Sequence, residues 1–124
     1  MNFPENLLYT KSHEWFDPAT GRVGISDHAQ GELGDVVYLD FAVESGEAVE
    51  SGGTLGTVES VKTVSDIYAP VAGTLAATND AIQDKPELVN EDPYGEGWLF
   101  QLSDTAEPEG LLSAADYQAL VGVA

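Results

Sequence analysis

The sequence predicts a mostly-β domain, built as a sandwich or flattened barrel, with short flanking helices and a C-terminal helix. Short β-branched or alternating segments recur along the chain, separated by turn residues at intervals of about eight to twelve residues. The helical patterns are short and do not alternate with strands, which argues against a doubly wound parallel sheet. We expect residues 1–124, of which 43% are hydrophobic, to form a single domain with a packed core.

The N-terminal half is expected to contain a hairpin, a capped helix and a strong strand. Ser26 can cap the helix, Asp27 suits its first turn and Gly34 can end it. The expected elements are strands over 7–10 and 13–16, a turn over 17–21, a strand over 22–25, a helix over 26–34 and a strand over 35–43.

The C-terminal half is expected to alternate short strands with turns before a final helix. A near-repeat, Ala42–Gly46 and Ala48–Gly52, predicts two turns around a short strand. Ser113 can cap the last helix. The remaining elements are a strand over 74–80 running into a turn, a helix over 86–90 with its proline in the first turn, a loop over 92–97, a buried strand over 98–102 and a helix over 114–121.

The composition excludes several classes of function. With 22 acidic and 4 basic residues the net charge is −18, which argues against nucleic acid and anionic membrane surfaces as partners. The acidity fits partners with basic docking patches, or it serves only to solvate the surface, and both readings stay open. No apolar run is long enough for a transmembrane helix, and residues 1–6 lack the features of a signal peptide, so we expect a cytoplasmic protein.

One lysine stands out in the β-rich stretch Gly56–Gly73. Lys62 lies near its middle, and we interpret it as a covalent attachment point. The alternatives are a strand lysine facing solvent and a Schiff-base nucleophile. The nearby Glu59 and Asp66 favour the protonated ammonium, which is the opposite of what a nucleophile needs. The chain has no cysteine, so any thiol chemistry would require a prosthetic group.

The two histidines do not predict a metal site. His13 precedes Glu14 and His28 follows Asp27, but neither forms a spaced ligand motif. Adjacent residues on the strand expected over 13–16 should point to opposite faces, so His13 and Glu14 are not expected to converge. The sequence also contains no phosphate-binding glycine motif and no nucleophile elbow.

The segment Glu59–Asp66 closely resembles the lipoyl-attachment site of the glycine cleavage system H proteins. Six further segments, in the expected order, carry the same resemblance: Tyr9–Trp15, Gly24–Gln30, Leu33–Val37, Tyr68–Gly73, Pro86–Asn90 and Asp92–Trp98. The resemblance implies the hybrid barrel-sandwich of lipoyl and biotinyl domains, with Lys62 on a turn between two strands. The flanking Val61 and Thr63 differ from the methionines that are typical of biotin carriers.

The resemblance implies a carrier that has no catalytic activity by itself. Lipoic acid would be attached as an amide to Lys62 by a lipoate ligase or transferase. It would accept the aminomethyl group after glycine decarboxylation by the P protein, present it to the T protein (aminomethyltransferase) and be reoxidised by the L protein (dihydrolipoyl dehydrogenase).

The resemblance also suggests roles for four other residues. Glu59 would help the ligase to recognise the site, and Ser12, Glu14 and Asp66 would form a cleft that shelters the aminomethyl group. Three alternatives remain open at this point: a lipoyl-relay protein, a lysine-dependent enzyme and a plain interaction domain.

Overall fold

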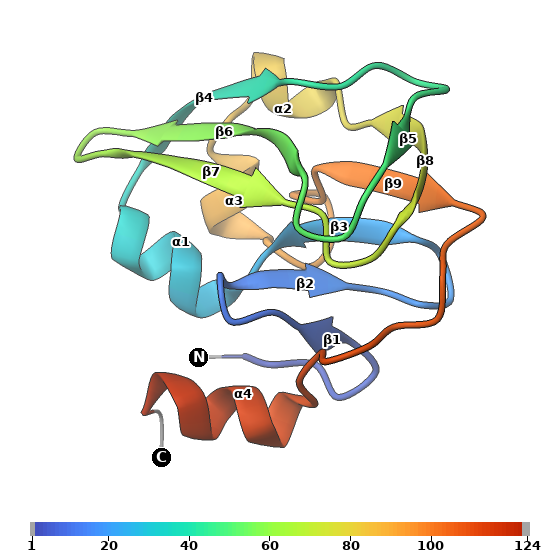
Figure 1. Ribbon diagram of the computed structural model, residues 1–124. Coiled ribbons are helices and arrows are strands. Elements are labelled where there is room, and N and C mark those ends of the chain that lie inside the picture. The colour runs from blue at the N-terminus through green and yellow to red at the C-terminus, as the bar shows by residue number, and fades with distance from the viewer. Residues whose placement is uncertain (1, 123–124) are drawn as a thin grey trace.

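The computed structural model describes residues 2–122, so Met1, Val123 and Ala124, at the ends of the predicted 1–124 domain, lie outside it. Two antiparallel sheets pack against each other (Figure 1). The larger has the strand order β1-β2-β3-β9-β8-β5 and the smaller the order β4-β6-β7. The strands are β1 (Leu8–Tyr9), β2 (Glu14–Phe16), β3 (Arg22–Ile25), β4 (Val36–Phe41), β5 (Ala48–Val49), β6 (Thr54–Ser60), β7 (Val64–Tyr68), β8 (Gly73–Thr78) and β9 (Phe100–Ser103).

The predicted mostly-β sandwich is confirmed, and the sheets formed by residues 2–122 do not close into a barrel. The main core lies between the sheets, where side chains from both interdigitate. Val58 and Ile67 come from the small sheet, and Val23, Leu75 and Phe100 from the large one. None of the five is more than 1% exposed. Their burial supplies the main driving force for holding the two sheets together.

Within residues 2–122, four helices flank the sheets: α1 (Asp27–Leu33), α2 (Ala81–Asp84), α3 (Leu88–Glu91) and α4 (Ala114–Val121). The predicted caps of the two longer helices are confirmed, because Ser26 accepts from the Ala29 amide and Ser113 from the Asp116 amide. The single turn α2 was not predicted. The helix expected over 86–90 begins at Leu88, so its proline precedes the helix and does not lie in its first turn.

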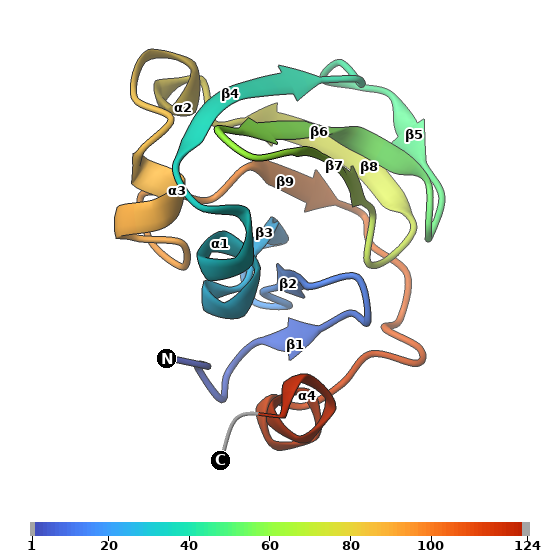
Figure 2. The ribbon, with the colours of Figure 1, turned by 90° about the vertical axis from the view of Figure 1, so that its left-hand side faces the viewer.

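The C-terminal helix α4 packs beneath β1, away from the small sheet (Figures 1 and 2). The Tyr117 ring stacks on Tyr9 at a centroid distance of 4.8 Å. Both rings are buried, together with Trp15, in a second apolar cluster. This cluster fixes the segment that enters β2, from which several site residues project. No helix within residues 2–122 combines the length and apolarity needed to cross a membrane.

Candidate functional site

Lys62 lies at the tip of the β6–β7 hairpin, which projects from the body of the molecule (Figure 1). The connection contains no glycine, asparagine or proline, and Ser60 explains how it turns. The Ser60 hydroxyl accepts hydrogen bonds from the amides of Lys62 and Thr63, both at 3.2 Å, and the Ser60 amide donates to the Thr63 carbonyl at 2.8 Å. A buried serine therefore closes the turn that exposes the lysine.

The hairpin tip rests on the connection between α1 and β4. The Val61 amide donates to the carbonyl of Asp35 at 3.0 Å. Gly34 has φ +78°, and a Cβ built on it would lie 3.1 Å from Cε of Lys62. The alkyl stem of the lysine thus passes close over a residue without a side chain. The tip is therefore stabilised by hydrogen bonds to Ser60 inside the hairpin and by contacts with residues 34 and 35 outside it.

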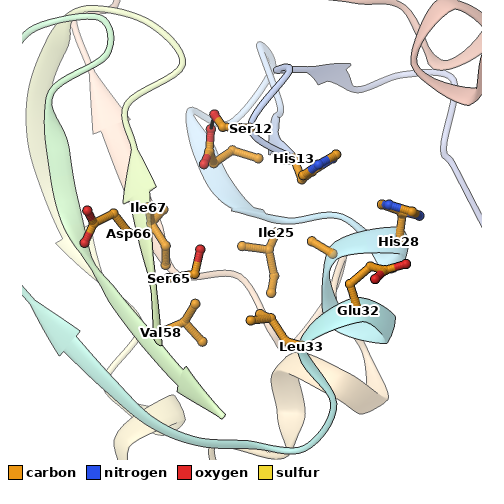
Figure 3. A pocket seen from close by; sticks show the side chains of 12 residues that line it. Ser12, His13, Ile25, His28, Glu32, Leu33, Val58, Ser65, Asp66 and Ile67 are labelled. Carbon is orange, nitrogen blue, oxygen red and sulfur yellow. Dashed lines mark hydrogen bonds between the residues drawn. The ribbon is translucent and has the colours of Figure 1, made fainter. Parts of the chain in front are cut away.

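A cavity of about 500 Å³ opens beside this hairpin. Its walls come from the turn before β2, from α1 and from β6 and β7. Figure 3 shows Ser65 and Ile67 on β7 facing His28 and Glu32 on α1 across the cavity, whereas the side chain of Asp66 is directed away from it. The lining residues are Ser12, His13, Glu14, Ile25, His28, Ala29, Glu32, Leu33, Val58, Ser65, Asp66 and Ile67. The cavity thus combines an apolar floor with several polar and titratable side chains, which could orient a small ligand.

The structure brings three of the predicted site residues together and leaves two apart. Ser12, Glu14 and Asp66 all line this cavity. Lys62 is exposed at the tip, outside the set that lines it, and Glu59 borders a separate hollow on the outer face of the small sheet. A ligand in the cavity would therefore lie beside Ser12, Glu14 and the β7 backbone at Asp66, and not beside Glu59.

The Glu14 carboxylate is almost completely buried, at 1% exposure. Its Oε1 accepts from the hydroxyls of Thr10 and Ser12, both at 2.6 Å, whereas Oε2 accepts only a long bond, 3.4 Å, from the Tyr68 amide. Burial raises the pKa of Glu14, and the hydrogen bonds from Ser12 and Thr10 partly oppose this shift. Because a carboxylate has about four acceptor sites, Oε2 retains capacity for a cationic ligand.

Two histidines that the sequence did not bring together meet at the cavity, His13 from the turn before β2 and His28 from α1. The rings of His13 and His28 lie 5.1 Å apart, and Nδ1 of His13 forms a 2.7 Å hydrogen bond with the Tyr117 hydroxyl. Burial lowers the pKa of His13, as does His28, whereas Glu32 acts in the other direction. Nδ1 of His28 is buried without a hydrogen-bond partner. Within residues 2–122, no three His, Cys, Asp or Glu side chains are arranged to hold a metal ion.

The prediction that the strand begins at His13 is wrong. The strand begins at Glu14, and His13 precedes it with a φ of +77°, in the left-handed region. Both residues line the cavity, but their side chains bond to different partners, His13 to Tyr117 and Glu14 to Thr10 and Ser12. A local sequence pattern carries no signal for such a conformation at a histidine, and the pairing with His28 depends on tertiary packing.

Comparison with known proteins gives consistent matches over nearly the whole chain. The family profile described as Glycine cleavage H-protein matches residues 7–123. The glycine cleavage system H protein of Herpetosiphon aurantiacus is 56% identical over 119 residues, which cover 94% of this chain and 92% of that protein. A probable glycine cleavage system H protein of Halobacterium salinarum is 52% identical over 122 residues, 98% of each chain.

The fold agrees with these matches. The crystal structure of a glycine cleavage system H protein from Mycobacterium marinum superposes with a TM-score of 0.89 at 40% identity, covering 97% of this chain and 99% of that one. The resemblance seen in the sequence is therefore confirmed. In this family lipoate is held covalently on a lysine, and the carrier serves the P, T and L proteins. The chain belongs to the glycine cleavage H-protein family, the lipoyl carriers of the glycine cleavage system.

Proposed function

We propose that Lys62 is the residue to which lipoate is attached. The observation that carries this proposal is its position at the tip of a projecting hairpin, where a modifying enzyme can reach it (Figure 1). The other two lysines differ in setting: Lys11 lies in the turn before β2, and Lys85 caps the short helix α2. Bound lipoate supplies the redox-active sulfurs that the cysteine-free chain lacks.

Ser12, Glu14 and Asp66 are proposed to dock the aminomethyl group. Such a group carries an amine, the Glu14 carboxylate faces the cavity, and Asp66 adds a second acid at its β7 wall. Oε2 of Glu14 has acceptor capacity to spare, while Ser12 and Thr10 hold the carboxylate in one orientation through Oε1. The apolar floor, including Ile25 and Ile67, suits an aliphatic arm and keeps water from the amine.

Glu59 is proposed to help the lipoate ligase or transferase to recognise the site. It lies opposite Tyr38 on β4 and opposite Val64 on β7, on the outer face of the small sheet. All three side chains are exposed. Because this face adjoins the tip, an enzyme that reaches Lys62 can contact Glu59 without entering the cavity.

The protein is proposed to act as a non-catalytic carrier. Lys62 lies outside the residues that line the cavity, so it lacks the apolar pocket that a Schiff-base lysine needs. Residues 1–124 are proposed to work as one domain, and the cytoplasmic location stays a prediction. A lipoyl relay to other complexes is the second candidate, since the same displayed lysine would serve it.

Intact-mass measurement with peptide mapping tests the attachment site. After incubation of the apo protein with lipoate, ATP and a lipoate ligase, we expect one lipoyl adduct, on the peptide containing Lys62. Lys62→Arg should abolish the adduct, whereas Lys85→Arg, which keeps the charge elsewhere on the chain, should be modified as wild type. An adduct on another lysine, or no adduct on folded wild-type protein, would contradict the proposal.

The docking role is tested by the lifetime of the loaded aminomethyl form. Glu14→Gln and Asp66→Asn each remove one carboxylate charge at or beside the cavity, and we expect each to speed the hydrolytic loss of the group several-fold. Asp40→Asn is the matched control, because Asp40 borders the outer hollow and not the cavity. Equal lifetimes in all four proteins would rule the docking role out.

Recognition through Glu59 is tested by initial rates of lipoylation. Glu59→Ala should be modified more slowly than wild type at equal concentrations of ligase. Glu50→Ala removes an exposed acid from the turn after β5 and provides the control for net charge. A wild-type rate for Glu59→Ala would show that the ligase does not depend on this carboxylate.

A further inference from the structure

Asn90, on α3, forms hydrogen bonds to the connection between α1 and β4 and to α1 through both the nitrogen and the oxygen of its side-chain amide. Its Nδ2 donates to the Gly34 carbonyl at 2.8 Å and to Oε1 of Gln30 at 3.1 Å. Its Oδ1 accepts from the Val36 amide at 2.9 Å. Three hydrogen bonds from one partly buried side chain thus fix the backbone on either side of Asp35.

The segment that Asn90 fixes is the one on which the hairpin tip rests. Asp35 lies between Gly34 and Val36, which Asn90 binds. Its carbonyl accepts a hydrogen bond from the Val61 amide at 3.0 Å. Gly34 lies directly beneath the alkyl stem of Lys62. Asn90 is therefore linked to the tip through one short backbone segment, although it contacts neither Lys62 nor the cavity.

This connection is needed because the tip has few restraints of its own. Val61 and Lys62 belong to neither strand, and Val61 is 67% exposed. Within residues 2–122, and apart from the internal bonds to Ser60, the backbone hydrogen bond that ties residues 61–63 to another part of the fold is the one from Val61 to Asp35. Displacement of residues 34–36 would free the tip to sample orientations that a modifying enzyme cannot use.

We infer that Asn90 is a positioning residue for modification of Lys62, because it holds the support on which the hairpin tip is presented. The inference rests on the proposed attachment of lipoate at Lys62. Suppose that only a fraction of the molecules hold the tip in the orientation that the modifying enzyme binds. The apparent affinity of the enzyme is then the intrinsic affinity multiplied by that fraction. Loss of the Asn90 hydrogen bonds should therefore slow lipoylation of Lys62 even when the fold is intact.

Asn79 offers a matched control within the same chain. It is a buried asparagine whose Nδ2 also donates to two backbone carbonyls, those of Glu96 at 2.8 Å and Trp98 at 2.7 Å. These partners belong to the loop between α3 and β9, and not to the support of the tip. Replacement of either asparagine by alanine should lower the free energy of unfolding by a similar amount. Only Asn90→Ala should change the orientation of the hairpin tip.

The test compares Asn90→Ala with Asn79→Ala in two measurements. The first is kcat/KM for lipoylation of the apo protein by a lipoate ligase, which should fall about fivefold in Asn90→Ala and stay near wild type in Asn79→Ala. The second is hydrogen exchange at the Val61 amide, which should be faster only in Asn90→Ala. If Asn90→Ala fails to fold, Asn90→Asp replaces it, because it keeps the acceptor for Val36 and loses both donors.

The two measurements separate this inference from the proposed function. Equal lipoylation rates and equal Val61 exchange in the two alanine variants would overturn the inference, even with Lys62 modified normally. Faster Val61 exchange with an unchanged lipoylation rate would overturn it as well, since the support would then not matter to the enzyme. Failure of wild-type protein to be modified at Lys62 would instead refute the attachment site, and with it the inference.

Discussion

The hydroxyl of Ser60 accepts a hydrogen bond from the backbone amide of Lys62 at 3.2 Å. Ser60 is 7% exposed, whereas the lysine is exposed. The same hydroxyl accepts from the Thr63 amide, so one side chain replaces the turn-forming residues that this hairpin lacks. The conformation in which the lysine is displayed therefore depends on a buried neighbour two residues away.

Replacement of Ser60 by alanine should loosen the tip without disturbing the sheets. Both acceptor bonds to the turn amides would be lost, and we expect a decrease of about 1 kcal/mol in the free energy of unfolding. Lipoylation should also slow, because the turn would no longer hold Lys62 in place. Urea denaturation and ligase rates measure the two effects. Ser51→Ala, at an exposed turn position, is the control, and equal behaviour of the two variants would show that Ser60 is dispensable.

The helices could be predicted where their signals are local. Ser26 and Ser113 were identified as caps from the sequence, and each accepts the expected amide hydrogen bond. A cap acts within one turn of its own residue, so neighbouring residues suffice to reveal it. The turn at Lys62 could not be predicted in this way, because serine is a weak turn signal and residues 61–63 include none of the usual turn formers.

The cavity was only partly predictable. Ser12, Glu14 and Asp66 were grouped through the resemblance to a known family, and the structure places all three on one cavity. Nothing in the sequence placed His13 beside His28, because this depends on a left-handed residue just before β2 and on packing against α1. Tertiary arrangements of this kind have no periodic signature.

Glu14→Gln should change the dependence of stability on pH. Because burial raises the pKa of Glu14 in the folded protein above its ordinary 4.5, the stability that this group contributes is complete below that value. It is lost as the pH rises through the raised pKa. The stability of wild type relative to Glu14→Gln should therefore fall as the pH rises above 4.5. Urea unfolding across this range provides the measurement, and parallel curves for the two proteins would contradict the assignment.

His13→Asn should change the pH dependence in the opposite direction. The pKa of His13 is lowered by burial and by His28, so the folded protein resists protonation that the unfolded chain accepts near pH 6.5. Stability from this group is complete above that pH and is lost as the pH falls through the lowered pKa. Asparagine tolerates the positive φ at this position. Wild type should thus lose stability relative to the variant on acidification below pH 6.5, as thermal unfolding in a buffer series would show.

Gly24→Ala should be the most destabilising small substitution near the site. Gly24 on β3 lies opposite Trp15 on β2, and a Cβ there would lie 2.6 Å from Nε1 of the indole. The indole cannot easily move, because it is buried and donates to the Pro93 carbonyl at 2.9 Å. We expect a loss of about 3 kcal/mol and a decrease of roughly 10 °C in Tm, measured by calorimetry. Gly31→Ala, in α1 with open space around the new Cβ, should instead be neutral or raise Tm slightly, and similar Tm values for the two variants would show that the Trp15 packing is not tight.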